Sequence, residues 1–121
     1  MKPQTDMHDT ENIPWTEIPA TDSGSRGQGV TEKILSRDPD NPDNCTRLLK
    51  MEKGYRSPGP LTHPLFWEEV LVLEGTLIDE RNNITAGPGW YACRHPGMPH
   101  GPFYTPTGVT TMEIHYMPKE S

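Results

Sequence analysis

Proline and glycine interrupt this chain so often that no long helical pattern remains. The 121 residues include 14 Pro and 11 Gly, separated by short runs that contain β-branched and aromatic residues. Short runs bounded by turn residues are typical of strands in a sandwich or barrel. Only 31% of the residues are hydrophobic, so the core that these strands enclose is small. We therefore predict an all-β fold in one domain.

The predicted strands follow one another at short spacing. They are residues 29–36, 45–55, 69–79, 90–94, 100–104 and 109–117. Clusters of Pro, Gly, Asn and Asp form the turns between them, including a hairpin turn at residues 81–83 and a tight turn at residues 95–99. We interpret residues 1–28 as an N-terminal arm with an extended segment, and residues 29–118 as the β-barrel domain.

Charge and hydropathy exclude several classes of partner. The formal net charge is −6, which disfavours nucleic acid as a partner. No run of about 18 apolar residues occurs, so no membrane span is expected, and the N-terminus lacks the apolar segment of a secretory signal. These features predict a cytoplasmic protein that binds neither nucleic acid nor a membrane. Cys45 and Cys93 then fit as free thiols, with a disulfide between them as the alternative.

Two histidines and one carboxylate near predicted turns form a candidate metal site. His63 and His100 each lie at a corner rich in Pro and Gly, and Glu68 follows His63 by five residues. A bend at Pro64 would turn His63 and Glu68 into one cavity. Two imidazoles and a carboxylate are a ligand set for Fe(II), Mn(II), Ni(II) or Zn(II), with coordination positions left open. The alternative is that they are ordinary turn residues and a surface carboxylate.

Residues 60–75 resemble the first of the two motifs of the cupin superfamily, usually written G-x5-H-x-H-x3–4-E-x6-G. His63 matches the second histidine, and Glu68 and Gly75 follow at the motif spacing. The resemblance extends over roughly residues 34–116. It implies a jelly-roll β-barrel of the RmlC-like type.

Residues 87–100 resemble the second cupin motif loosely, with His100 in its histidine position. Residues 95–103 are similar to the same turn in the cupin domains of zinc-binding anti-sigma factors and in dioxygenase-like single-domain cupins. The resemblance implies a divalent metal ion held by His63, Glu68 and His100. Fe(II) is the favoured ion, with Zn, Mn or Ni as alternatives.

Leu61 stands where the first motif has its first histidine. Three explanations remain open. The two histidines and Glu68 form a sufficient ligand set; or a neighbour, His95, Glu69 or His115, supplies the missing ligand; or metal binding is lost and the cavity only binds a ligand.

Two further histidines are candidates for catalytic roles. His115 lies on the last predicted strand and shares a face with Glu113. Because the pKa of histidine is near neutral, His115 facing inward would suit acid–base work, but an outward direction is equally compatible. His95 either lines the mouth of the cavity or lies exposed in its turn. The residues expected to line a substrate pocket, or to form plain core, are Phe66, Trp90, Tyr91, Met98 and Phe103.

The apolar run in residues 70–73 also predicts an assembly. If Glu68, Val70 and Val72 face the barrel interior, Leu71 and Leu73 face outward and need a cover. Either the segment around Trp15 or a second subunit supplies it, and similar cupins are commonly dimers, so we predict a homodimer. The resemblance implies metal-dependent chemistry on a small molecule, foremost dioxygenation. The alternatives are a non-catalytic metal or ligand sensor and a non-redox isomerase or cyclase.

Overall fold

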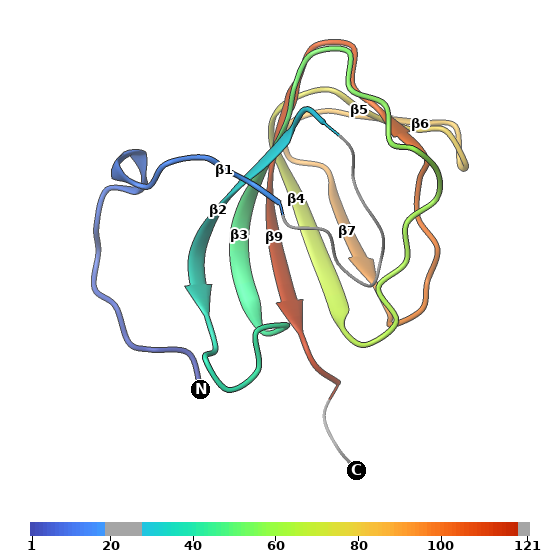
Figure 1. Cartoon of the computed structure of the whole chain (residues 1–121). Coiled ribbons are helices and arrows are strands. Elements are labelled where there is room, and N and C mark those ends of the chain that lie inside the picture. The colour runs from blue at the N-terminus through green and yellow to red at the C-terminus, as the bar shows by residue number, and fades with distance from the viewer. Residues whose placement is uncertain (19–27, 119–121) are drawn as a thin grey trace.

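The computed structural model describes residues 1–18 and 28–118, within which nine strands form two antiparallel sheets (Figure 1). The larger sheet has the order β1-β2-β3-β9-β4-β7 and the smaller one the order β6-β5-β8. The strands are β1 Thr16–Glu17, β2 Val30–Arg37, β3 Cys45–Met51, β4 Trp67–Gly75, β5 Leu77–Asp79, β6 Ile84–Ala86, β7 Tyr91–Arg94, β8 Phe103–Tyr104 and β9 Val109–Tyr116. The all-β jelly-roll prediction is confirmed.

Some predicted strand bounds are wrong. Strand β3 ends at Met51 instead of residue 55, because a turn follows in which the Tyr55 N–H donates to the Glu52 carbonyl and Gly54 has φ +85°. Strand β8 is shorter than the predicted residues 100–104. Strand β6, which the sequence pattern did not predict, is the return arm of the predicted hairpin at residues 81–83.

Gly75 marks the point where the chain leaves the large sheet and enters the small one. It ends β4 with φ +85°, and a Cβ built there would lie 2.0 Å from the Gly108 carbonyl oxygen. Any side chain would therefore collide with the turn before β9, and the backbone conformation is one that L-residues rarely adopt. The motif glycine thus permits the close crossing of two backbone segments.

Alternation along β4 has the predicted direction. Glu68, Val70 and Val72 are buried, whereas Leu71 is half-buried and Leu73 is 43% exposed on the outer face. Strand β9 pairs with β4 and brings its own buried positions alongside them. The inner face of the large sheet is therefore built from every second residue of each strand.

The polarity of this inner face changes along the strands. Near the β4–β5 crossing, Met51 lies opposite Val109 in the pairing of β3 with β9, but at the other end of the same pair Cys45 lies opposite His115. The apolar core clusters toward the first end, and its members are Val30, Leu49, Met51, Tyr55, Leu61, Val72, Leu77, Phe103 and Val109. Buried charged and histidine side chains occupy the second end.

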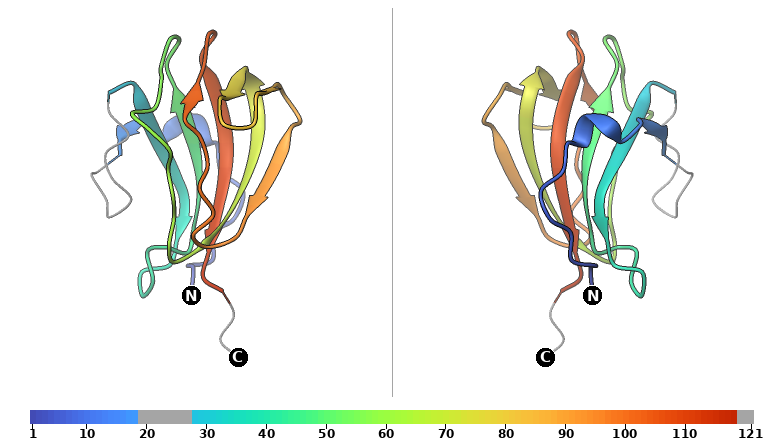
Figure 2. Two further views of the ribbon diagram at one scale, coloured as in Figure 1. Left: turned by 90° about the vertical axis from the view of Figure 1, so that its right-hand side faces the viewer. Right: turned by 90° about the vertical axis from the view of Figure 1, so that its left-hand side faces the viewer.

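Residues 1–18 run along the outer face of the large sheet (Figure 2). Lys2 donates to the Thr46 hydroxyl at 2.9 Å, and the Trp15 ring lies 4.8 Å from the Lys33 ammonium and 5.5 Å from that of Lys50. Trp15 therefore packs against β2 and β3. Among the described residues, no helix is both long and apolar enough to cross a membrane.

Candidate metal centre

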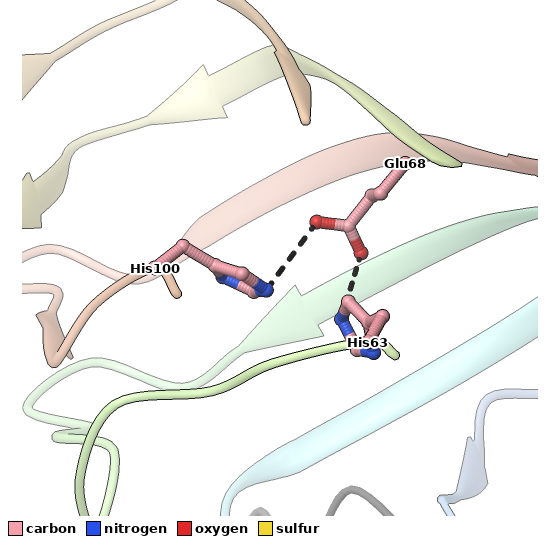
Figure 3. Close-up of side chains that lie close together, drawn as sticks. All are labelled: His63, Glu68 and His100. Atoms are coloured by element: carbon pink, nitrogen blue, oxygen red, sulfur yellow. Dashed lines mark ion pairs between the residues drawn. The ribbon is translucent and has the colours of Figure 1, made fainter. Parts of the chain in front are cut away.

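A short backbone bridge brings the two motif histidines together. Leu61 and His100 exchange two backbone hydrogen bonds, of 2.7 and 2.8 Å, and the Gly97 N–H donates to the His63 carbonyl at 2.9 Å. These bonds hold the segment before β4 against the turn after β7. Both imidazoles are thereby directed at the carboxylate of Glu68, which projects inward from β4 (Figure 3).

The three predicted metal ligands lie within ligand distance of one another and are buried. Nε2 of His63 lies 3.2 Å from Oε2 of Glu68, and Nε2 of His100 lies 3.9 Å from Oε1. Their exposed fractions are 6% for His63, 1% for Glu68 and 4% for His100. Arg94, which pairs with Glu68 in the β4–β7 ladder, donates to Oε1 at 3.0 Å.

His115 faces inward with Glu113, as the shared-face prediction requires, and both are 5% exposed. Nε2 of His115 lies 2.9 Å from Oε2 of Glu68 and 3.4 Å from Oε1 of Glu113. Burial lowers the pKa of His115, but hydrogen bonds to Cys45 and the two carboxylates outweigh burial and raise that pKa to about 11. In the absence of a metal, His115 is therefore a cation between two carboxylates.

Glu68 carries a full charge in this setting. Burial raises its pKa, but hydrogen bonds from His115 and His63 outweigh burial and hold the pKa well below its usual value. An ionised carboxylate at this depth needs partners to offset its lost hydration. It has them on both oxygens, with Arg94 on Oε1 and two imidazoles on Oε2.

Arg47 extends this buried network, and the sequence pattern did not single it out. Its guanidinium donates to Glu113 at 2.7 and 2.9 Å and to Glu32 at 2.8 Å. The signal was present in the alternation, because Arg47 lies two residues before Leu49 and so shares its inward face. The sequence pattern did not single out Arg94 either. Arg94 lies opposite Glu68 in the pairing of β4 with β7.

Two of the five predicted pocket residues lie at the site. The Phe66 ring stacks on His63 at 4.8 Å and on His115 at 4.4 Å, and the buried Phe103 ring lies 5.6 Å from that of His100. These rings cover the imidazoles with apolar surface.

The other three predicted pocket residues do not join the histidines. Tyr91 is 59% exposed, because alternation along β7 turns it to the outer face, where it donates to Glu69. Trp90 is 53% exposed just before that strand, and Met98 is 36% exposed in the turn at residues 95–99.

The structure also shows where His95 and the two cysteines lie. His95 is exposed, with Nδ1 2.8 Å from the Pro96 carbonyl oxygen and its ring edge-on to Trp67. Cys45 and Cys93 are both free thiols, as expected. Cys93 is exposed, because it lies on the outward side of β7 with Tyr91.

The chemistry of the donor set fits a divalent metal ion. Nδ1 of the buried His63 has no hydrogen-bond partner among the described residues, and Nε2 faces only the carboxylate of Glu68, at 3.2 Å, although buried polar atoms are nearly always bonded. One ring nitrogen of His63, one of His100 and a carboxylate oxygen of Glu68 lie within 4.8 Å of one another. Two imidazoles and a carboxylate suit Fe(II), Zn(II) and related ions.

The chain matches the model of one protein family over almost its whole length. The model of the ChrR cupin-like domain family matches residues 3–118, which includes nearly all of the N-terminal segment as well as the barrel. No curated protein matches the sequence.

Solved structures with the same fold are similar over nearly the whole chain. An RmlC-like cupin from Shewanella frigidimarina has 18% identity and a TM-score of 0.70, covering 97% of this chain and 95% of its own. The polyketide cyclase RemF from Streptomyces resistomycificus has 14% identity and a TM-score of 0.70, covering 96% and 83%. An acetylacetone dioxygenase from Acinetobacter johnsonii has 16% identity and a TM-score of 0.65, covering 98% and 80%. At these identities the likeness shows the fold alone.

Proposed function

This chain belongs to the ChrR cupin-like domain family, and from that premise we propose that it is a metal-dependent enzyme with dioxygenase-type activity on a small molecule. The observation that carries the proposal is the buried group of His63, Glu68 and His100. Two imidazoles and one carboxylate with open positions are the ligand set of non-haem Fe(II) oxygenases. The metal, with Fe(II) favoured over Zn, Mn or Ni, would supply open coordination positions and redox chemistry.

The residues around this group have separate tasks. Arg94 holds Oε1 of Glu68 at 3.0 Å and so fixes the direction of the carboxylate. Phe66 and Phe103 pack against the imidazole rings and exclude water, which strengthens electrostatic interactions in the site. His115 can hold or move a proton at Nε2, beside Glu68. His95 is exposed in its turn, where it could contact a substrate at the mouth of the site.

The similar structures support a small-molecule substrate without naming it. One is described as an acetylacetone dioxygenase and another as a polyketide cyclase. Both names describe chemistry on compounds rich in carbonyl oxygens, which a metal can bind through its open positions. We therefore propose β-dicarbonyl and aromatic compounds as the first substrates to test.

Metal analysis of the purified protein tests the site. The chain is purified without chelators, and its metal content is compared with that of His100→Ala and of His95→Ala, which removes an exposed histidine. We expect about one metal ion per chain in the wild type and in His95→Ala, and none in His100→Ala. Equal metal content in wild type and His100→Ala contradicts the site.

Oxygen uptake on a panel of β-dicarbonyl and aromatic compounds tests the activity. Iron in the protein, with uptake that depends on one of the compounds and disappears in His100→Ala, supports the proposal. Zinc in the protein, with no uptake after iron is substituted for it, contradicts dioxygenation. That result would instead favour a sensor or a non-redox isomerase or cyclase.

We also propose that the chain forms a homodimer through the outer face of the large sheet. Leu48, Met112 and Leu71 lie opposite one another in the register of β3, β9 and β4, and together they form an apolar row on that face. Leu73 remains 43% exposed next to it, whereas Trp15 packs on β2 and β3. A second copy would cover this surface.

A further inference from the structure

Arg94 is the most accessible charged side chain that contacts Glu68. Its side chain is 14% exposed, whereas those of Glu68, His63 and His100 are 2%, 7% and 4% exposed. Arg94 projects from β7, opposite Glu68 in the ladder with β4. A molecule that comes from solvent therefore reaches Arg94 more readily than it reaches the three candidate metal ligands.

The guanidinium of Arg94 has donors that Glu68 does not use. Arg94 donates to Oε1 of Glu68 through Nη1 at 3.0 Å, and among the described residues no other acceptor binds it. Within the same ranges, the buried polar side-chain atoms without a hydrogen-bond partner belong to His63, His100 and Thr111, so Nε and Nη2 of Arg94 are accessible to solvent. These two nitrogens form an edge with parallel N–H groups, which matches the two oxygens of a carboxylate.

The orientation of this guanidinium is fixed by its neighbours. Its Cζ lies over the Phe103 ring, 5.6 Å from the centroid, and Phe103 is buried. Glu68 holds Nη1 on the other side. A planar cation placed between an aromatic face and a carboxylate keeps one direction. The free edge is therefore preorganised, and a ligand that binds there loses little further conformational freedom.

The charges around the site favour an anion once a metal ion is bound. Glu32, Glu68 and Glu113 are the buried carboxylates of this network, and Arg47 and Arg94 are its arginines. These permanent charges nearly cancel, so a divalent ion leaves the network with a net positive charge. Because charges interact strongly away from bulk water, a negatively charged substrate would be attracted more than a neutral one.

We propose that Arg94 recognises a carboxylate of the substrate through Nε and Nη2. Arg94 contacts the candidate ligand Glu68 itself, so a molecule of a few carbon atoms at an open position of the metal can reach the guanidinium. The preferred substrates are then β-dicarbonyl compounds that carry an acid group. This inference rests on the proposed function and narrows its substrate class. The rival explanation is that Arg94 only fixes the direction of Glu68.

Calorimetric titration of the Zn(II)-loaded protein with 2,4-dioxopentanoate and with its methyl ester tests the proposal. Both compounds carry the same two carbonyl groups, and only the first is an acid. We expect the wild type to prefer the acid, and this preference to fall at least about 10-fold in Arg94→Gln, because hydrogen bonds between charged groups are lost. The amide of the variant keeps a donor for Glu68. Arg56→Gln, which changes an exposed arginine paired with Glu80, should keep the wild-type preference.

The rival explanation predicts a different result. If Arg94 only positions Glu68, Arg94→Gln weakens the binding of Zn(II), or of acid and ester alike, and leaves the preference unchanged. That result would overturn the inference and leave the metal site in place. A wild type that binds the acid no more tightly than the ester would overturn it as well. If Arg94→Gln does not fold, Arg94→Lys keeps the charge but lacks the paired N–H groups, and an unchanged preference in that variant has the same meaning.

Failure of the metal site can be recognised separately. If the wild type binds no more Zn(II) than His100→Ala, the proposed function loses its site. The same titrations on the metal-free protein then decide the role of Arg94. Binding of the acid that disappears in Arg94→Gln would support recognition of a carboxylate, and absence of binding in the wild type would overturn it.

Discussion

The inner faces of β3, β9 and β4 are apolar near one end of the barrel and charged at the other. Near the β4–β5 crossing, Leu49 and Val72 are buried beside Thr111 of β9. A few residues along the same strands, Arg47 and Glu113 take the inward positions. The same alternation thus builds an apolar core at one end and a cluster of buried charged and histidine side chains at the other.

The two ends are stabilised by different physics. Burial of apolar surface contributes about 25 cal/mol per Å² and needs no specific partner. A buried charge costs several kcal/mol unless its partners are in place. The charged end meets this requirement with two carboxylates around Arg47 and with Arg94 and imidazoles around Glu68. Loss of one partner at the charged end should therefore lower the free energy of unfolding more than loss of one apolar contact at the other end.

Arg47→Ala, at the charged end, should have the largest effect on stability. It leaves Glu32 and Glu113 buried without their shared cation, and removal of one partner of a buried ion pair costs about 3–5 kcal/mol. The free energy of unfolding from urea titration measures the loss. As control, Arg56→Ala removes an exposed arginine paired with Glu80 and should cost less than about 1 kcal/mol. Equal losses in the two variants would contradict the comparison.

Leu49→Ala tests the apolar end. Leu49 is 1% exposed in the core cluster, so truncation should cost about 2–4 kcal/mol through lost burial and the cavity left behind. The metal content of the folded variant should equal that of the wild type, because the ligands lie at the other end. Loss of metal from folded Leu49→Ala would show that the two ends are not separable.

The central residues of the charged end, His63, Glu68 and His100, were predictable from the sequence, whereas the arginines around them were not. Alternation placed Glu68, Val70 and Val72 inward, because the period of two is a property of any extended chain. Motif spacing selected His63 and His100, and the structure brings them together at Glu68.

Strand β9 shows why the sequence did not predict the direction of its polar side chains. Its inward residues Glu113 and His115 are polar, while its outward residues Met112 and Ile114 are apolar and half-buried. A rule that turns apolar residues inward gives the wrong face here, so the sequence left the direction of His115 open. Arg47 and Arg94 escaped because their partners come from strands distant in sequence, and pairing across a sheet is set by topology rather than by local pattern.

The charged end should make the free energy of unfolding of the metal-free protein depend on pH, because His115 and Glu68 lie there. The folded pKa of His115 is raised to about 11, so its contribution to stability is fully present below the unfolded value of about 6.5 and is lost as pH rises from there toward 11. The folded pKa of Glu68 is lowered, so its contribution is present above its ordinary value and lost as pH falls below it. Stability should therefore be highest between about pH 4.5 and 6.5.

Urea titrations of the chelator-treated protein at several pH values measure this profile. Above pH 6.5 the decline should be at most about 1.4 kcal/mol per pH unit. Leu49→Ala should show the same slope at lower stability, whereas His115→Gln should lose most of the alkaline decline. A profile that is flat from pH 6.5 to 9 in the wild type would contradict the charged state of His115.

Leu73→Lys tests whether the outer face of the large sheet, near the apolar end, forms the proposed dimer interface. Leu73 follows the buried Val72 on β4 but is 43% exposed, so the fold should tolerate lysine within about 0.5 kcal/mol. A homodimer that covers Leu73 should not, because it would bury an unpaired ammonium. Sedimentation velocity should then show a dimer for the wild type and a 13.6 kDa monomer for Leu73→Lys. Leu65→Lys, at a position 56% exposed in the bend before β4, should remain dimeric. A monomeric wild type, or equal dimerisation of both variants, would mean that this apolar surface faces solvent and that the monomer is stable without a cover.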